Sequence, residues 1–552
     1  MSEAVTREII RGKLLAAVDE MGVVLARASM SPVIYEVLDF ATGICDATGE
    51  LVAQNNGITL FTGTFATQVR AVLGRHGDSI ADGDVFITND PYEGGTHSAD
   101  MALIKPVFVH GRLVAFAIAV AHWSEVGGSV PGSLAPDASE VFQEGLRLPL
   151  VRLYRRGERQ EDLVRLITEN VRLPGHSLCD LEAELAAVRL GESRLLEMAG
   201  RYGIERVLAT FAGILEASEA QGRAAVSDLP DGVYTAEDQI DGDGSVDEPI
   251  PIRVVVTIAG DRMTCDFSGC APQRRGPVNC ARGALLSAVK TVFKALVDPS
   301  APSNEGWFRP VEVVIPDGTV FSAVKPAPTG WYYEGTAHAS ELVWKALAPL
   351  APDRLGAGSY LSLCAHYLCG TDPATGETFV HIEPQVGGWG AHPSGDGESG
   401  LIATTDGDTY NHSVELLEAR LPLRIRRYAL NTAEAAGHGE RRGGLGVIRD
   451  YEMLAEDGVV YASVGRSRVR PWGLAGGGEG GVNRVELVQG SGVREAARLR
   501  LTPLRRGERM VVVTGAGGGW GDPRSRAPEL VDADLADGLI DAATARRVYG
   551  RG

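Results

Sequence analysis

The spacing of apolar residues changes along the chain and predicts helices and strands in turn. In residues 6–28 apolar side chains recur at helical spacing, which is typical of a helix with one buried face; they are Ile10, Leu14, Ala17, Met21, Leu25 and Ala28. Short apolar runs bounded by turn residues then predict strands at 40–45, 50–53, 102–109 and 113–121. Helical spacing returns at about residues 180–227.

The second half of the chain carries mainly strand and turn signals. Residues 228–249 are polar and turn-rich, which is typical of a domain link or a hairpin edge. Alternating apolar residues predict strands in 251–267, and a helix is expected at 281–296. Further strands with glycine-rich loops follow, and a helical tail closes the chain at 527–549.

These elements predict an α+β, multi-domain protein of mixed antiparallel β-sheets with covering helices. A chain of 552 residues is long enough for more than one hydrophobic core. We expect four parts: an N-terminal metal-binding α+β domain at 1–227, a central α+β domain at 228–350, a β-rich, glycine-rich domain at 351–525 and a helical tail at 526–552.

The two strands predicted at 102–109 and 113–121 are joined by His110 and Gly111, a connection short enough for a tight hairpin. A two-residue turn would pair position 109 with position 112, so that paired positions sum to 221. Asp100 would then lie opposite Ala121, with His122 one step further along. Because paired Cα atoms lie roughly 4.5–5.5 Å apart, Asp100 and His122 are expected at the same open end of the hairpin.

A third polar residue, His97, lies in the loop that leads into this open end. Each of these side chains alone is more often a hydrogen-bonded structural residue. Two imidazoles and a carboxylate that converge are, however, the donor set that a divalent metal with open coordination positions requires. Glu125, three residues after His122, is the candidate acid or base beside the metal, or else a solvated loop carboxylate.

Composition limits the partners of the chain. The formal net charge is −19 and the isoelectric point about 5.1, so nothing favours nucleic acid or an anionic membrane as a partner. The longest apolar run, at 113–121, is far too short to span a bilayer, and no charged-then-apolar leader opens the sequence. We therefore expect a cytoplasmic protein.

Seven scattered cysteines argue against a disulfide framework and for a reducing compartment. Cys265 with Cys270, and Cys364 with Cys369, each enclose four residues, a spacing that structural zinc sites can use. The second pair lies in a mainly apolar run, which favours buried structure instead.

Glycine-rich segments suggest nucleotide binding only at first sight. Gly515 and Gly517 fit the start of a dinucleotide fingerprint, but Trp520 occupies its last position and Asp522-Pro523 follows where a helix should begin. The sequence contains no G-x-x-x-x-G-K-[ST] motif. We expect a glycine-rich loop that closes a β domain, and no nucleotide site in this chain.

Three segments around the predicted hairpin resemble the hydantoinase B/oxoprolinase family: NDPYEGGTHSAD at 89–100, PVF at 106–108 and AHWSEVGGSVPGS at 121–133. This family includes subunits of N-methylhydantoinase, 5-oxoprolinase, caprolactamase, and the acetone and acetophenone carboxylases. The resemblance implies that His97, Asp100 and His122 bind a divalent metal, and that Asp39 is the fourth ligand. The family tends to have a histidine where this chain has Phe61, which affects substrate identity rather than the metal.

The resemblance also implies a partner, because the reactions of the family consume ATP. In the family an A-type subunit or domain binds ATP and phosphorylates a substrate oxygen, while the B-type part holds the metal. We therefore expect one divalent ion (Mn, Zn or Fe) in this chain, ATP bound by an A-type partner subunit, a small-molecule substrate and a hetero-oligomer.

The leading functional hypothesis is a subunit of an ATP-dependent hydrolase that opens a cyclic amide or imide, such as a hydantoin, oxoproline or a lactam. Phosphorylation makes the amide oxygen a leaving group, and water activated by the ion attacks the carbon, with Glu125 as proton shuttle. The alternative within the family is a ketone carboxylase of the acetone or acetophenone type. Two other hypotheses remain: an iron oxygenase with a two-histidine, one-carboxylate site, and a scaffold with a structural metal.

Overall fold

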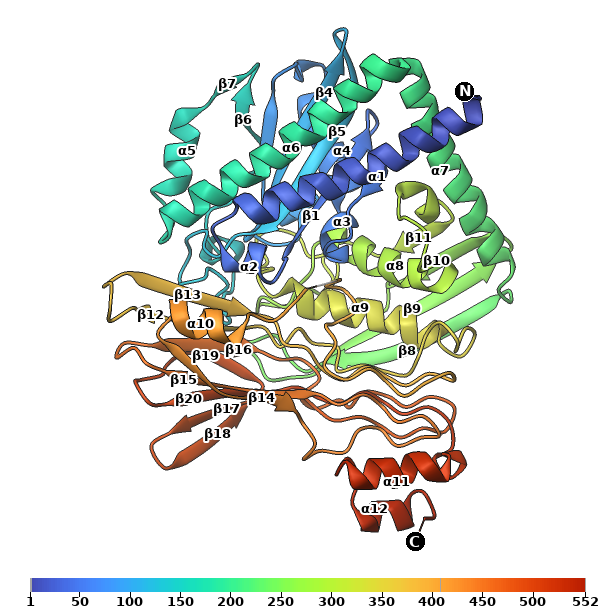
Figure 1. Ribbon diagram of the computed structural model, residues 1–552, viewed down its shortest axis with the longest axis vertical. Coiled ribbons are helices and arrows are strands. Elements are labelled where there is room, and N and C mark those ends of the chain that lie inside the picture. Colours follow the sequence, from blue (N-terminus) through green and yellow to red (C-terminus); the bar gives the residue numbers. More distant parts are fainter. Residues whose placement is uncertain (1, 408, 552) are drawn as a thin grey trace.

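The computed structural model describes residues 2–407 and 409–551. Within these residues the chain forms an α+β structure of several β-sheets, antiparallel apart from one parallel pair, with helices packed on and between them (Figure 1). The predicted fold class is confirmed. No helix in this part of the chain is both long enough and apolar enough to cross a membrane.

The N-terminal sheet has the strand order β2-β1-β5-β4-β3-β6-β7. Its strands are β1 (Phe40–Asp46), β2 (Leu51–Gln54), β3 (Val85–Thr88), β4 (Asp100–Val109), β5 (Arg112–His122), β6 (Val151–Arg155) and β7 (Glu158–Arg159). All neighbours pair antiparallel. The central strands β4 and β5 are buried along nearly their whole length, because helices cover them.

Two long helices cross this sheet side by side (Figure 1). They are α1 (Glu3–Ala28) and α6 (Pro174–Tyr202), and α7 (Ile204–Ser227) continues from α6 towards the second sheet. Shorter helices in the same part of the chain are α2 (Pro32–Tyr35), α3 (Thr59–Thr62), α4 (Phe65–His76) and α5 (Glu161–Thr168). The predicted stripe of α1 is buried from Ile10 to Leu25, so hydrophobic burial stabilises this helix on the sheet.

The β4–β5 hairpin has the predicted turn, but the predicted register is wrong by one residue. Val109 pairs with Arg112 and Phe108 with Leu113, as expected. The next pair joins Val107 to Ala115, so Val114 is an extra residue in β5 and forms a β-bulge. From the bulge onwards paired positions shift by one, and Asp100 lies directly opposite His122 instead of Ala121.

A second sheet has the order β11-β10-β9-β8. Its strands are β8 (Gly232–Ile240), β9 (Ile250–Ala259), β10 (Arg262–Asp266) and β11 (Val311–Val314). The polar stretch that was expected to be a link or a hairpin edge thus contains an edge strand, β8. Two helices pack against each other beside this sheet: α8 (Arg282–Val297), as predicted, and α9 (Tyr332–Leu347), which was not predicted.

The C-terminal half contains two further antiparallel sheets. One has the order β13-β12-β16-β19, with β12 (His366–Thr371), β13 (Thr378–Glu383), β16 (Val459–Ser463) and β19 (Arg498–Pro503). The other has the order β14-β15-β20-β17-β18, with β14 (Leu423–Leu430), β15 (Val447–Met453), β17 (Arg484–Gln489), β18 (Gly492–Ala496) and β20 (Arg509–Val513). Helix α10 (Val414–Arg420) precedes β14, and the tail forms α11 (Pro528–Ala536) and α12 (Ala542–Arg547).

Glycine-rich segments from distant parts of the C-terminal half pack backbone against backbone. Gly517 N donates to Gly444 O at 2.9 Å, Gly519 N to Gly478 O at 2.9 Å, and Gly388 N to Gly515 O at 3.0 Å. A Cβ atom on Gly517 would lie 1.9 Å from the carbonyl oxygen of Trp389, so only glycine fits there. The segment that resembles a dinucleotide fingerprint therefore has a packing role.

The hydrophobic core is continuous from α1 to β20, and residues of the N-terminal, central and C-terminal parts contribute to one cluster. The tail has a small core of its own, formed by Val531, Ile540, Ala545 and Tyr549. The division into four domains stays a prediction.

Candidate metal centre

Three adjacent strands of the N-terminal sheet bring acidic and imidazole side chains together where their ends meet. Asp39 directly precedes β1, His122 ends β5 and Asp100 begins β4. Because β5 runs antiparallel to both neighbours, these three ends meet. The backbone confirms their proximity, since His122 N donates to Asp39 O at 3.0 Å.

The side chains of His97, Asp100 and His122 converge on one point. Asp100 Oδ1 lies 2.9 Å from His97 Nε2 and 3.0 Å from His122 Nδ1, and the two imidazole nitrogens lie 3.3 Å apart. All three side chains are buried. The structure thus brings together three of the four predicted ligands, and Asp39 joins them in lining the same cavity.

The hydrogen bonds of His97 show why these contacts suit a cation. Its Nδ1 lies 2.9 Å from the carbonyl oxygen of Gly330, which assigns the proton to Nδ1 and leaves Nε2 with a free lone pair. That lone pair faces Asp100 Oδ1 at 2.9 Å. Two acceptors at this distance repel each other unless a proton or a metal cation lies between them.

The distances also match a metal-ligand set. Zinc–nitrogen bonds are about 2.0–2.1 Å long, so two ligand atoms of a tetrahedral site lie roughly 3.3 Å apart. The separations among His97, Asp100 and His122 are 2.9–3.3 Å. The residues therefore fit a divalent cation.

A cavity of about 50 Å³ adjoins these side chains. Tyr332 from α9 donates its hydroxyl hydrogen to Asp100 Oδ2 at 3.2 Å and packs against the ring of His97. Phe61, the residue at which the chain departs from the resembled family, also lines this cavity, as does Asp406 from the loop before α10. The cavity is thus closed by residues from three distant parts of the sequence.

Three carboxyl groups share this small space and affect one another. Burial would raise the pKa of Asp100, but the imidazoles of His97 and His122, when protonated, outweigh it and hold that pKa well below its usual range. Burial raises the pKa of Asp39 to about 7, and nearby Asp100 and Asp406 add to the effect against the opposing influence of His122. Burial likewise raises the pKa of Asp406 to about 7. A bound cation would compensate this concentration of negative charge.

Glu144 fixes the loop that orients His97. Its carboxyl oxygens accept hydrogen bonds from the backbone N–H groups of Thr329 at 3.0 Å and Gly330 at 2.7 Å. The carbonyl oxygen of Gly330 in turn accepts the Nδ1 hydrogen of His97. Glu144 therefore acts on the site through one residue, Gly330, as outer partners of metal-binding histidines commonly do.

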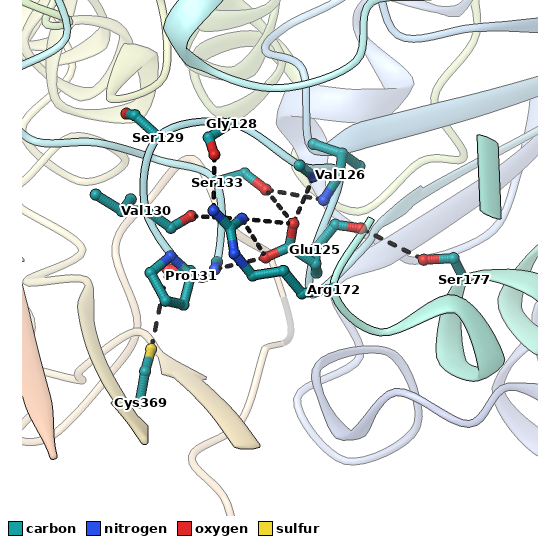
Figure 2. Close-up of polar contacts among 12 residues, drawn as sticks. Glu125, Val126, Gly128, Ser129, Val130, Pro131, Ser133, Arg172, Ser177 and Cys369 are labelled. Atoms are coloured by element: carbon teal, nitrogen blue, oxygen red, sulfur yellow. Dashed lines mark hydrogen bonds and ion pairs between the residues drawn. The ribbon is translucent and has the colours of Figure 1, made fainter. Parts of the chain in front are cut away.

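Glu125, predicted as the acid or base, is held by hydrogen bonds from its own loop and from Arg172 (Figure 2). Its carboxylate accepts from Gly132 N at 2.9 Å and from Arg172 Nη1 at 3.1 Å, and Arg172 also donates to the carbonyl oxygens of Gly128 and Val130. The Glu125 side chain is fully buried. Among the described residues, those that line the metal cavity include Asp39 and Asp406 but not Glu125.

Three features of this site were missed from sequence: Tyr332, Asp406 and the Glu144–Gly330 support. Each lies far in sequence from the hairpin, so no local spacing indicates it. The strong helix-forming and aromatic residues around Tyr332 could have identified α9, but nothing in them points towards His97.

Comparison with known proteins finds relatives that match this chain over nearly its whole length. The chain is 32% identical to caprolactamase subunit beta of Pseudomonas jessenii, over 99% of this chain and 96% of that protein. The crystal structure of the ATP-dependent caprolactamase from Pseudomonas jessenii superimposes with a TM-score of 0.92 at 30% identity, covering 99% of this chain and 96% of that one.

A nucleotide-free structure of acetone carboxylase shares the fold, with a TM-score of 0.89 at 19% identity over 99% of this chain and 79% of that one. The sequence model of the family described as Hydantoinase B/oxoprolinase matches residues 3–523, nearly the whole chain. The protein belongs to the hydantoinase B/oxoprolinase family.

Proposed function

We propose that this chain is the metal-containing B-type subunit of an ATP-dependent hydrolase that opens cyclic amides or imides such as hydantoins, oxoproline or lactams. The observation that carries the proposal is the buried convergence of His97, Asp100 and His122 beside a cavity. It occurs in a chain that is similar over its full length to a caprolactamase subunit.

In this proposal Asp39, His97, Asp100 and His122 hold one divalent ion, with Mn, Zn and Fe as the candidates that their nitrogen and oxygen donors allow. When bound, such an ion supplies an activated water and polarises an oxygen of the substrate. Gly330 and Glu144 keep the His97 ring in place, and Tyr332 offers a hydroxyl donor at the wall of the cavity.

Two carboxyl groups are candidates to move the proton. Glu125 would have to release Arg172 and its loop contacts before it could act. Asp406 lines the cavity already, and its pKa of about 7 suits proton transfer near neutral pH. We propose both, and the variants described in the Discussion distinguish them.

In this proposal a partner subunit binds the ATP. The sequence has no phosphate-binding loop motif, and the relative of known structure is an ATP-dependent enzyme one of whose subunits this chain resembles. We propose an A-type subunit that binds ATP and phosphorylates the substrate oxygen, so that the ring carbon is ready for attack in the B-type subunit. The complex is then a hetero-oligomer.

The cavity sets a condition on substrate binding. A volume of about 50 Å³ holds an ion with a few waters, since one water needs about 10–15 Å³ of such space. Val33 and Ile382 line both this cavity and a neighbouring groove of about 560 Å³. We propose that movement of this shared wall admits the substrate ring.

The test is substrate-stimulated ATP turnover by the chain co-purified with its A-type partner. Hydantoins, oxoproline and lactams are compared with small ketones, with and without bicarbonate. ATP turnover stimulated by a cyclic amide, with ring-opened product, supports the hydrolase. Stimulation by ketones only with bicarbonate would establish the carboxylase instead. Oxygen-dependent turnover without ATP or a partner would favour the iron oxygenase.

A further inference from the structure

We propose a second metal site in the C-terminal half, formed by His366, His381 and Glu383 with His412 as a fourth ligand, which takes a divalent late transition metal such as Zn²⁺. This proposal goes beyond the proposed function, because it concerns another sheet and does not depend on the reaction. It rests on four observations: convergent donor atoms, fixed ring orientation, orphaned nitrogens and an access path.

The register of two strands brings the donors together. His366 begins β12 and pairs directly with Glu383 at the end of β13, so both side chains lie on one face. His381 lies two positions before Glu383 and shares that face. One donor atom from each of these three residues lies within 4.8 Å of the others. All three are buried, at 0%, 2% and 0% exposure in chain order.

The ring of His366 has the orientation of a metal ligand. Its Nδ1 lies 3.1 Å from the carbonyl oxygen of Cys364, which assigns the proton to that nitrogen. Its Nε2 is buried and has no partner among the described residues. The same arrangement orients His97 at the first centre, where Nδ1 is bonded to the carbonyl oxygen of Gly330. A backbone carbonyl that fixes one nitrogen commonly prepares the other for a metal.

His412 supplies a further unsatisfied nitrogen. Its Nδ1 lies 3.6 Å from Glu383 Oε1, beyond hydrogen-bond range, and is buried without a partner in the described part of the chain. Its backbone N–H donates to the same Glu383 oxygen at 2.6 Å, and this contact holds the His412 segment against the cluster. Two buried imidazole nitrogens without partners would each cost free energy unless a ligand satisfies them.

The neighbouring charges and the donor types together limit which metals suit this cluster. Arg449 Nη1 lies 3.3 Å from Glu383 Oε1 and opposes any cation at the site, although its guanidinium also packs over the ring of Tyr428. Tyr451 donates to the other oxygen of Glu383. A hard ion such as Mg²⁺ needs several oxygen ligands, which this cluster lacks. Imidazole-rich sets instead suit zinc and its late transition-metal neighbours.

The site has an access path and a structural consequence. His381 and His412 both line the groove of about 560 Å³, so an ion could reach the cluster from there. Between and beside the ligands, Ile382, Pro384 and Thr409 line the first metal cavity. A metal that joins β12, β13 and the His412 segment would therefore fix one wall of the candidate active site.

The test counts metal in the full-length chain. Metal-free protein is loaded with Zn²⁺, washed and measured by elemental analysis in wild type, His97→Ala, His366→Ala and the double variant, with His392→Ala as a histidine control outside both clusters. We expect two, one, one and zero ions per chain, and two in the control. Loaded Co²⁺ should show separate visible spectra for the two single variants.

A crystal of wild-type protein loaded with Zn²⁺ tests the site without any substitution. An anomalous peak between His366 Nε2, His381 and Glu383 is expected. One ion per wild-type chain that is lost in His97→Ala, with no peak at His366, would overturn this second site and leave the first intact. Loss of one ion in His366→Ala while His97→Ala loses none would support the second site and refute the first.

Discussion

Asp100 and His122 lie directly opposite each other on β4 and β5, and Asp100 Oδ1 is 3.0 Å from His122 Nδ1. A single extra residue, Val114, sets this register. Without the bulge His122 would lie one position beyond the pair, and because side chains alternate along a strand, it would point to the opposite face from Asp100. The bulge thus places the side chains of Asp100 and His122 on the same face of the hairpin, where they face each other.

Replacing His122 by alanine should remove the bound metal. The variant loses a direct ligand, so its affinity should fall by more than the roughly 10–100-fold that loss of an outer partner costs. Elemental analysis of purified wild type, His122→Ala and the control His392→Ala measures this. The same comparison in the His366→Ala background isolates the His97 site, because that background lacks the proposed second site. Full retention of metal by His122→Ala in that background would refute the ligand assignment.

Replacing Glu144 by alanine should weaken metal binding without removing a ligand. The substitution leaves the N–H groups of Thr329 and Gly330 without their acceptor, so the loop that holds His97 loosens. We expect metal affinity about 10–100-fold lower and unfolding free energy about 2–4 kcal/mol lower, from two lost hydrogen bonds in a buried site. Titration with Zn²⁺ and denaturant unfolding check the two effects. Unchanged affinity would show that Glu144 does not orient the ligand.

The variants Glu125→Gln and Asp406→Asn separate the two candidate proton carriers. The Glu125 carboxylate bonds to Arg172 and Gly132, so its replacement should lower stability by about 1–3 kcal/mol. If Asp406 carries the proton, Asp406→Asn should lower kcat by about 100-fold or more with metal retained, and Glu125→Gln should keep most of its kcat once folded. The opposite pattern would assign the proton to Glu125.

Two glycine substitutions should have opposite effects on stability. Gly517→Ala would place Cβ 1.9 Å from Trp389 O, against rigid backbone, and should lower the unfolding free energy by about 3 kcal/mol or more. Gly213, inside α7, has open space around its missing side chain, so Gly213→Ala should raise stability by about 0.5–1 kcal/mol. Thermal unfolding compares both with wild type. A tolerated Gly517→Ala would contradict the packing described for the glycine segments.

The sequence was informative where local pattern determines structure. The stripe of α1, the two strands of the hairpin and their turn all follow from apolar spacing and from His110-Gly111. The bulge was not predictable, since the residues around Val114 are ordinary strand formers. Helix α9 was missed because it is buried on nearly all sides, so its apolar residues show no one-sided stripe.

The candidate site could be predicted only in part, because local sequence pattern determines only some of its contacts. His97, Asp100 and His122 lie within one supersecondary unit, so the hairpin predicts that they meet at its open end, but the bulge at Val114 decides that Asp100 and His122 face each other. Asp39 needed the family resemblance. Asp406 and Tyr332 reach the cavity through packing of distant segments, and the cluster around Glu383 depends on the register of β12 with β13. No spacing rule within the sequence specifies such contacts.

The ratio of ring-opened product to ATP consumed, measured in one sample of the complex with its A-type partner, tests the proposed division of labour most directly. The wild-type complex is compared with the His97→Ala complex after elemental analysis has confirmed loss of the metal from the His97 centre. We predict that ATP consumption continues in the presence of a cyclic amide while product per ATP falls at least about 100-fold, the range that positioned catalytic groups contribute. An unchanged ratio in the metal-depleted variant would contradict a catalytic role for the centre formed by Asp39, His97, Asp100 and His122.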